Sequence, residues 1–332
     1  MARQRMILDP NGDLLVILRN PSRITEPSEA GEPIGRDSSQ VIEPEPLQLE
    51  TSDLETTTVA DSDSGNEIIL TPLDDDYEHD WVFKTSSKHL ALSSTYFKRM
   101  LNGPWYEATE IHEDGLKHWV VEDFDPTAME IILNIIHLRN RTVPHTLDEV
   151  DTLVEIARIV DYLQCHEAME YYASLWIEDL EYRYQTPGGY DIELLRWICI
   201  VGVFHQNTLF KQCTRVAITG NHFGIATLGL PILAQISNMT NQRRMDHLDE
   251  IFASVYSLMD SLAQDTICSF ECDALRLGIL TKHLKTEFLT LRPKRPYPRM
   301  SIDEVLDVLS RLSALVDWSK SDGHSRCGFI DL

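Results

Sequence analysis

The sequence predicts an α+β fold, in which a small β-sheet with a cluster of helices is followed by an all-helical region. Three observations lead to this prediction. Three short apolar runs, all within the first 124 residues, are typical of strands. Serine and aspartate stand where the apolar rhythm changes to helical spacing, as helix caps do. After residue 126 the apolar residues recur almost only at helical intervals.

The strands are expected at 13–18, 81–85 and 118–124. "DLLVIL" is a continuous apolar run after the turn-forming "DPNG", which is typical of a strand buried on both faces. "WVFKT" is its expected hairpin partner, and "HWVVEDF" is the third strand. The chain therefore leaves the sheet once, between the first two strands, for about 60 residues at an extra closure cost of about 2.4 kcal/mol.

That excursion, residues 20–78, is expected to be a disordered acidic insertion. Between Pro21 and Asp80 there are 17 acidic residues against two arginines, and no apolar periodicity is sustained. Much of the net charge of -24 is therefore local to this segment. Ser52 and Ser64 precede acidic residues as in substrates of acidophilic kinases, and a phosphate there would add to the same charge.

A short apolar run inside the insertion is similar to a SUMO-interaction motif, in which a strand adds to a sheet edge and flanking acids meet a basic rim. The three apolar residues of this motif are followed by Asp74, Asp75 and Asp76. The alternative is that the run packs against the chain's own sheet. The residues are Ile68, Ile69 and Leu70.

Helices are expected wherever a capping residue precedes helical spacing. Ser86 or Ser87 caps a first short helix, and Ser93 or Ser94 caps a second. Asp125, with Pro126 at the first helical position, opens a central helix to about residue 139. Later helices are expected at 146–165, 166–180, 192–204, 210–218 and 243–262, with a last one opened by the capping box "SIDE" at 301–304.

Composition excludes several classes of function. A net charge of -24 opposes direct binding to nucleic acid, because such binding gains free energy by neutralising phosphates. No run of about 18 apolar residues is present, so neither a membrane span nor membrane binding is expected. The sparse cysteines indicate reduced thiols, which places the chain in the cytoplasm or nucleus.

Motifs for catalysis and cofactor binding are absent from the sequence. There is no G-x-S-x-G elbow, phosphate-binding loop or dinucleotide fingerprint, so we expect no enzyme, no catalytic residue and no cofactor. Cys268, Cys272 and His283 lack a fourth ligand at zinc-site spacing, so no metal site is expected. The basic stretch "RPKRPYPR", 292–299, is interpreted as a stiff loop between helices, with nuclear import or peptide docking as the alternatives.

The order of elements and one stretch of sequence resemble the BTB/POZ domain, in particular the kind found in many fungal proteins. "FKTSSKHLALSSTYFKRMLNG" is similar to the family's "FKVHKAVLAASSPYF"-like signature, and "VVEDFDPTAMEIILNIIH" and "VDTLVEIARIVDYLQCHEAMEYY" follow in the family's order. The resemblance covers about residues 8–180 without the insertion. Ser86 and Ser87 stand where the family more often has histidine and a basic residue.

The resemblance implies a non-catalytic module that self-associates, as a homodimer, and recruits other proteins as a scaffold or adaptor. The basic position of the family lies near the dimer interface in several members, so the implied self-association face is the helical pair. Its residues are Ser87, Leu90, Ser94, Tyr96 and Phe97.

Two further roles follow from the same resemblance. Cullin-binding members carry an apolar-x-Glu motif after the third strand, and here Met129 and Glu130 follow an alanine. The chain is therefore a candidate substrate adaptor of a cullin-based ubiquitin ligase, and the alternative is a transcriptional co-regulator acting through protein partners. The implied cullin contacts are Ala128, Glu130, Ile136 and His137.

The sequence divides the chain into four parts. A BTB/POZ domain is expected at 1–19 and 79–182, interrupted by the acidic insertion at 20–78. A helical C-terminal region follows at 190–318, and 319–332 is expected to be a flexible tail. Neither the identity of the partner nor the role of the helical region follows from the sequence.

Overall fold

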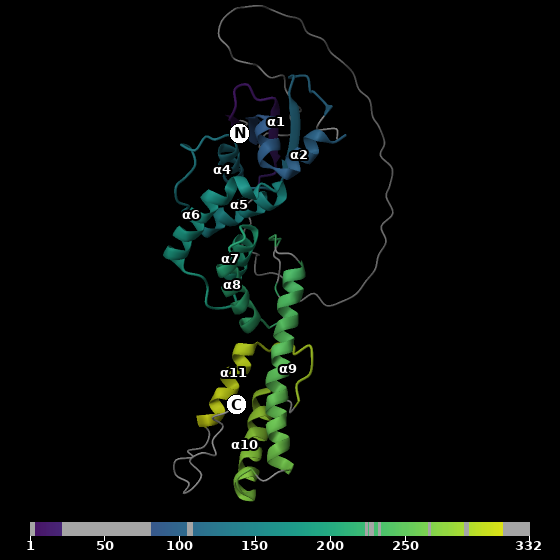
Figure 1. Ribbon diagram of the computed structural model, residues 1–332, viewed down its shortest axis with the longest axis vertical. Helices are drawn as coiled ribbons and strands as arrows, with labels where there is room; N and C mark the ends of the chain where they lie inside the picture. Colours follow the sequence, from purple (N-terminus) through teal and green to yellow (C-terminus); the bar gives the residue numbers. More distant parts are fainter. Residues whose placement is uncertain are drawn as a thin grey trace, which may run out of the picture.

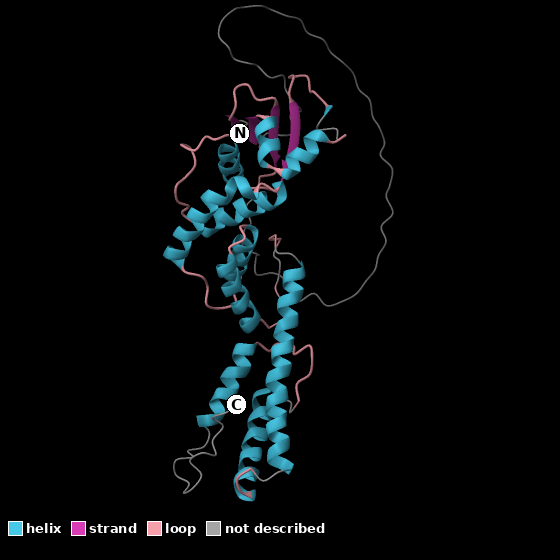
Figure 2. Cartoon of the chain, viewed as in Figure 1, coloured by secondary structure: helices cyan, strands magenta, loops and turns pink. Residues whose placement is uncertain are grey.

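The computed structural model describes residues 4–21, 81–104, 109–222, 225, 229–231, 234–264, 267–288 and 292–314. The strands lie together at one end of the molecule, and helices form the rest (Figure 1; Figure 2). The predicted α+β class with an all-helical C-terminal region is confirmed.

The sheet has four strands in the order β1-β3-β2-β4. They are β1 (Gln4–Ile7), β2 (Leu14–Arg19), β3 (Trp81–Thr85) and β4 (Lys117–Glu122). β2 pairs antiparallel with β3, with Val16 opposite Phe83, and parallel with β4. Residues 14–18 are all buried, as a strand between two neighbours and under helices should be. The three strands predicted from the sequence are confirmed.

Strand β1 was not predicted. Only Met6 and Ile7 in it are apolar, and it lies at the edge of the sheet, parallel to β3. Pairing with a strand so distant in sequence leaves no local pattern to detect. The acidic segment connects β2 to β3 in the sequence. Residues 22–80, which include the SUMO-like run and both candidate phosphorylation sites, lie outside the described residues.

Two short helices follow β3 in the chain, α1 (Ser87–Ser93) and α2 (Thr95–Asn102). The Ser94 hydroxyl accepts the Phe97 N–H at 3.1 Å, so the predicted cap of the second helix is confirmed. After β4, the Asp125 carboxylate accepts the Ala128 N–H at 2.8 Å, which confirms the predicted start of α4 (Pro126–Ile136). Every residue of α4 from 128 to 136 except Glu130 is buried, so this helix is central, as its apolar sequence predicts.

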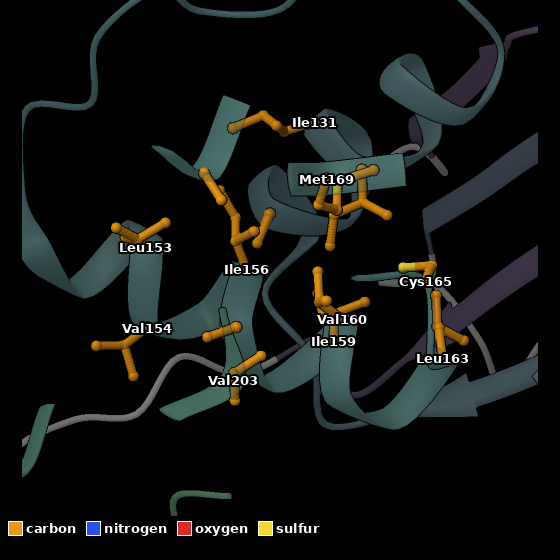
Figure 3. Packing of buried hydrophobic residues seen from close by; sticks show 14 of the residues in the cluster. Ile131, Leu153, Val154, Ile156, Ile159, Val160, Leu163, Cys165, Met169 and Val203 are labelled. Carbon is orange, nitrogen blue, oxygen red and sulfur yellow. The ribbon is translucent and has the colours of Figure 1, made fainter. Parts of the chain in front are cut away.

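Helix α5 (Val150–Leu163) is the centre of the core, and α6 (His166–Tyr184) packs beside it. Figure 3 shows Ile156, Ile159 and Val160 of α5 among buried side chains of neighbouring helices. These include Ile131 of α4, Met169 of α6 and Val203 at the end of the next helix along the chain.

The hydrophobic core continues beyond the expected domain end at residue 182. Helices α7 (Ile192–Val203) and α8 (Asn207–Gly220) belong to the same buried cluster as α4, α5 and α6. Trp197 and Ile198 are almost completely buried in it, and the Arg196 guanidinium pairs with Asp151 of α5 at 3.1 Å. The first two helices of the C-terminal region therefore pack as part of the same unit as the sheet.

The remaining helices form a bundle that extends to the other end of the molecule (Figure 1), and α8 packs against it. They are α9 (Ala234–Gln264), α10 (Phe270–Phe288) and α11 (Ile302–Ser310), with a 3-10 turn at Arg311–Ala314. Two smaller clusters centred on Phe252 and Leu280 hold them together. Helix α9 starts at Ala234 rather than near residue 243, whereas the capping box of α11 is confirmed. Residues 315–332 lie outside the described chain.

The basic loop before α11 is held against α9. The Arg244 guanidinium of α9 donates to the carbonyl oxygens of Tyr297 at 3.3 Å and of Met300 at 2.7 Å. Arg295 forms ion pairs with Asp246 and Asp249 of α9. The loop is therefore fixed between the helices, while the side chains of its four basic residues, Arg292, Lys294, Arg295 and Arg299, are exposed.

Candidate interaction surface

The N-terminus of α1 is capped from another element. Ser86 stands at the cap position, but its side chain forms no capping hydrogen bond. Instead, the Asp13 carboxylate at the entrance to β2 accepts the Ser87 N–H at 2.8 Å and the Ser87 hydroxyl at 2.6 Å. Partial burial acts to raise the pKa of Asp13, but the hydrogen bonds from Ser87 outweigh it, so the pKa is lowered from its usual value. Of the two serines that depart from the family pattern, Ser87 therefore fixes the start of α1 to Asp13, whereas the Ser86 side chain makes no capping hydrogen bond.

A histidine joins α1 to the end of α4. The Ser86 N–H donates to His137 Nε2 at 2.9 Å, and His137 Nδ1 lies 2.8 Å from the Leu133 carbonyl oxygen. Since an N–H can only donate and a carbonyl can only accept, Nδ1 carries the proton and the ring is neutral. Burial lowers the pKa of His137, and the neighbouring His89, whose ring centroid is 5.2 Å away, lowers it further.

Large apolar side chains are exposed on the elements that meet at this junction. Leu92 on α1 is 86% exposed, and Leu138, directly after His137, is 74% exposed. Leu138 has φ 58°, a left-handed conformation that costs a branched residue about 1–2 kcal/mol. Ile7 of β1 is also exposed, and its carbonyl oxygen accepts Arg139 Nη1 at 2.9 Å, which places β1 beside the end of α4. We call these residues the α1–α4 surface: Ile7, His89, Leu92, His137 and Leu138.

The self-association face implied by the sequence needs correction in three positions. Leu90 and Phe97 are fully buried and Ser94 is 1% exposed, because they form the inner side of α1 and α2. Tyr96 is half-buried, and its hydroxyl accepts Trp119 Nε1–H at 3.3 Å. Of that set, only Ser87 and Tyr96 are partly exposed. A second chain that binds these helices would therefore contact mainly other residues of α1 and α2.

The residues implied as cullin contacts are also partly internal. Ala128 is fully buried and Ile136 is 3% exposed, so neither side chain is available to a partner in this conformation. His137 uses both ring nitrogens within the chain. Glu130 on α4 is half-buried, as is His137. The motif itself therefore offers a partner little apolar surface.

The described cysteines form no disulfide, and among them only Cys268 is exposed. Burial raises the pKa of Cys165 and of Cys199 to about 12, so both thiols stay protonated and unreactive. His283 Nε2 is bonded to the Val308 carbonyl oxygen at 2.8 Å. Within the described ranges no group of three or more metal-binding side chains comes together, and no described helix is long and apolar enough to cross a membrane.

The element order around the α1–α4 surface can now be compared with known families. The profile of the BTB/POZ domain matches residues 78–179, from the start of β3 to the last turns of α6. A BTB/POZ domain lies in this chain. The BTB/POZ domain is a domain of protein–protein interaction. The helical pair α1–α2, the strand β4 and the central helix α4 occur here in the order that the sequence predicted. No curated protein matches the chain significantly.

The BTB/POZ match does not reach β1, β2, α7 or α8. β1 and β2 nevertheless complete the sheet of the domain, and α7 and α8 share its core. Sequence reasoning missed the exposed residues Leu92 and Leu138. The signal that could have found Leu92 is its place one turn after His89 on the side of α1 opposite Leu90.

Proposed function

We propose that this chain is a non-catalytic interaction module of the cytoplasm or nucleus that self-associates through the α1–α4 surface and recruits other proteins. The observation that supports this proposal is the pair of exposed leucines, Leu92 and Leu138, at a helix junction of a BTB/POZ domain. Leu138 keeps a strained backbone conformation while its side chain points to solvent. Such strain persists where the surroundings or a function require it.

Size-exclusion chromatography with light scattering on the full chain tests self-association. A two-fold contact places the same residues on both partners, so one substitution removes two contacts. We expect a concentration-dependent dimer, and we expect Leu92→Glu to raise the dimer dissociation constant at least about tenfold, as loss of a central apolar anchor does. Because Leu92 is so exposed, the melting temperature should hardly change.

Leu138→Asn separates association from folding. Asparagine tolerates left-handed φ better than leucine, so the monomer should be as stable as the wild type or slightly more stable. The polar side chain should nevertheless weaken the dimer. Leu275→Glu on α10, where the leucine is 52% exposed, is the control on a different helix and should leave the molar mass unchanged. A chain that is monomeric at all concentrations would contradict the proposed homodimer.

A second proposal is a substrate adaptor of a cullin-based ligase, supported by Glu130 in the first half of α4, whose side chain is partly exposed. Ala128→Arg is unsuited to test it, since that side chain is buried and would disrupt α4. Glu130→Arg is the better variant. Loss of co-purification with the cullin in this variant, at unchanged melting temperature, would support the adaptor role, and no co-purification of the wild type would exclude it. For the alternative of a transcriptional co-regulator, the described residues offer no supporting contact.

A further inference from the structure

Helix α6 has an exposed apolar seam that faces away from the core. Tyr171 is 70% exposed, Leu175 is 39% exposed and Tyr182 is 87% exposed. At 3.6 residues per turn, these three positions lie within about 40° of one another around the helix. The opposite side of α6 carries the buried Met169, Ala173 and Trp176. The seam runs along about three turns of a helix on the outer edge of the molecule (Figure 1).

Helix α6 is fixed at its C-terminal end and in its middle, so the seam is rigid. At the C-terminal end, the Tyr184 hydroxyl donates to the Asp148 carbonyl oxygen at 2.9 Å, and Arg183 donates to the Leu147 carbonyl and to Asp179. The Trp176 Nε1–H donates to the Pro144 carbonyl at 3.1 Å in the middle of the helix. A partner that binds the seam would therefore meet a preformed surface and would not have to order it.

One side of the seam is lined by carboxylates. Glu167, Glu170 and Glu178 are exposed and Glu181 is half-buried, and the helical period places all four on the same flank. The acidic residue beyond the other flank, Asp179, is already paired with Arg183 at 2.6 Å. The seam thus combines apolar and aromatic anchors with a one-sided acidic border.

We propose that this face of α6 binds a basic amphipathic helix of another protein. Apolar residues at helical spacing would pack on Tyr171, Leu175 and Tyr182, and lysine or arginine side chains on one edge would pair with the carboxylates. The tyrosines suit this role because they offer large rigid contact areas with a polar tip.

Charge opposes two other occupants of the seam. In an antiparallel two-fold contact, a second copy of α6 would place its own four glutamates against these four, and like charges repel. The chain's segment 21–80 has 17 acidic residues and two arginines, so it has the wrong sign as well. The basic loop at 292–299 is held on α9. The partner is therefore expected to be a different molecule with a basic helix.

The test selects helical peptides, displayed on phage and long enough to match α6, against the full chain. We expect the enriched peptides to have an excess of lysine and arginine and apolar residues at helical spacing. The best of them, made synthetically, should bind at least tenfold more weakly to the Leu175→Glu variant and to a Glu170→Lys, Glu178→Lys double variant. Its affinity should also fall with rising salt.

Leu306→Glu on α11, an exposed leucine on a different helix, is the matched control and should bind the peptide as the wild type does. The proposal would be overturned by no enrichment, by enrichment of neutral or acidic peptides, or by binding that is insensitive to Leu175→Glu. A change in molar mass caused by Leu175→Glu would show that the seam joins two copies, and this fourth result would overturn it too. Peptide binding should be unaffected by Leu92→Glu, so failure of this inference is distinguishable from failure of the proposed self-association.

Discussion

The cap of α1 by Asp13 allows a worked prediction, because one carboxylate from the entrance to β2 accepts both hydrogen bonds at the helix start. Removing a capping side chain costs about 1 kcal/mol, within a range of about 0.5–2. Asp13 is largely exposed, so solvent screening keeps the expected loss for Asp13→Ala in the lower half of that range. In a domain of this size, about 1 kcal/mol lowers the melting temperature by about 2–4 °C.

A double-mutant cycle with Ser87→Ala isolates the contact. The serine variant keeps the backbone bond to Asp13, so it should lose about 0.5–1 kcal/mol, and the double variant should lose little more than Asp13→Ala alone. Chemical denaturation of all four proteins gives the coupling free energy, expected at about 0.5 kcal/mol. Additive losses, or a wild-type melting temperature in Asp13→Ala, would refute the capping role.

The same contact has a predictable pH dependence. Because the pKa of Asp13 is lowered from 3.8 in the folded chain, its stabilisation is present above that value and is lost as the pH falls through the lowered pKa. The difference in stability between wild type and Asp13→Ala should therefore be full at neutral pH and should disappear in strong acid. A difference that persists unchanged into strong acid would mean that the carboxylate charge is not involved.

Three further perturbations address other parts of the fold. Gly12→Ala would place a Cβ 2.3 Å from the Thr85 carbonyl oxygen, a backbone atom, so we expect a loss of several kcal/mol, seen as a large fall in the denaturation midpoint. Because the pKa of His137 is lowered in the folded chain, protonation of the ring opposes folding, and the thermal stability should decline as the pH falls below 6.5. His137→Gln, which can still accept the Ser86 N–H, should make this decline less steep. An unchanged slope in the variant would contradict the role of His137. Arg244→Met removes the guanidinium that donates to the carbonyl oxygens of Pro296, Tyr297 and Met300, so limited proteolysis should cut the loop at 292–300 faster than in the wild type. An unchanged rate would show that the arginine does not hold the loop.

The sequence by itself determined the local elements, because their signals act over a few residues. The caps at Ser94, Asp125 and Ser301 bond to N–H groups three positions ahead, and each helix begins where its cap predicts. The signature of the BTB/POZ domain and the burial of β2 were readable for the same reason, since apolar spacing reports burial directly.

The residues of the candidate interaction surface could be predicted only in part, because a family signature records which residues recur and not which face of a helix they occupy. Leu90 and Phe97 matched the signature yet lie inside, whereas Leu92 and Leu138 are exposed. The exposed seam on α6 was likewise hidden, since its tyrosines look like core residues in a helical pattern. A side chain's exposure depends on which neighbours pack against its helix.

Only the tertiary structure decided the contacts between distant segments. It added β1 to the edge of the sheet, supplied the cap of α1 from Asp13, and fixed the neutral form of His137 through Ser86. It also placed α7 and α8 in the core of the sheet domain. These contacts join residues that are far apart in the chain, and their free energy depends on the packed arrangement, which a local pattern of residue types does not encode.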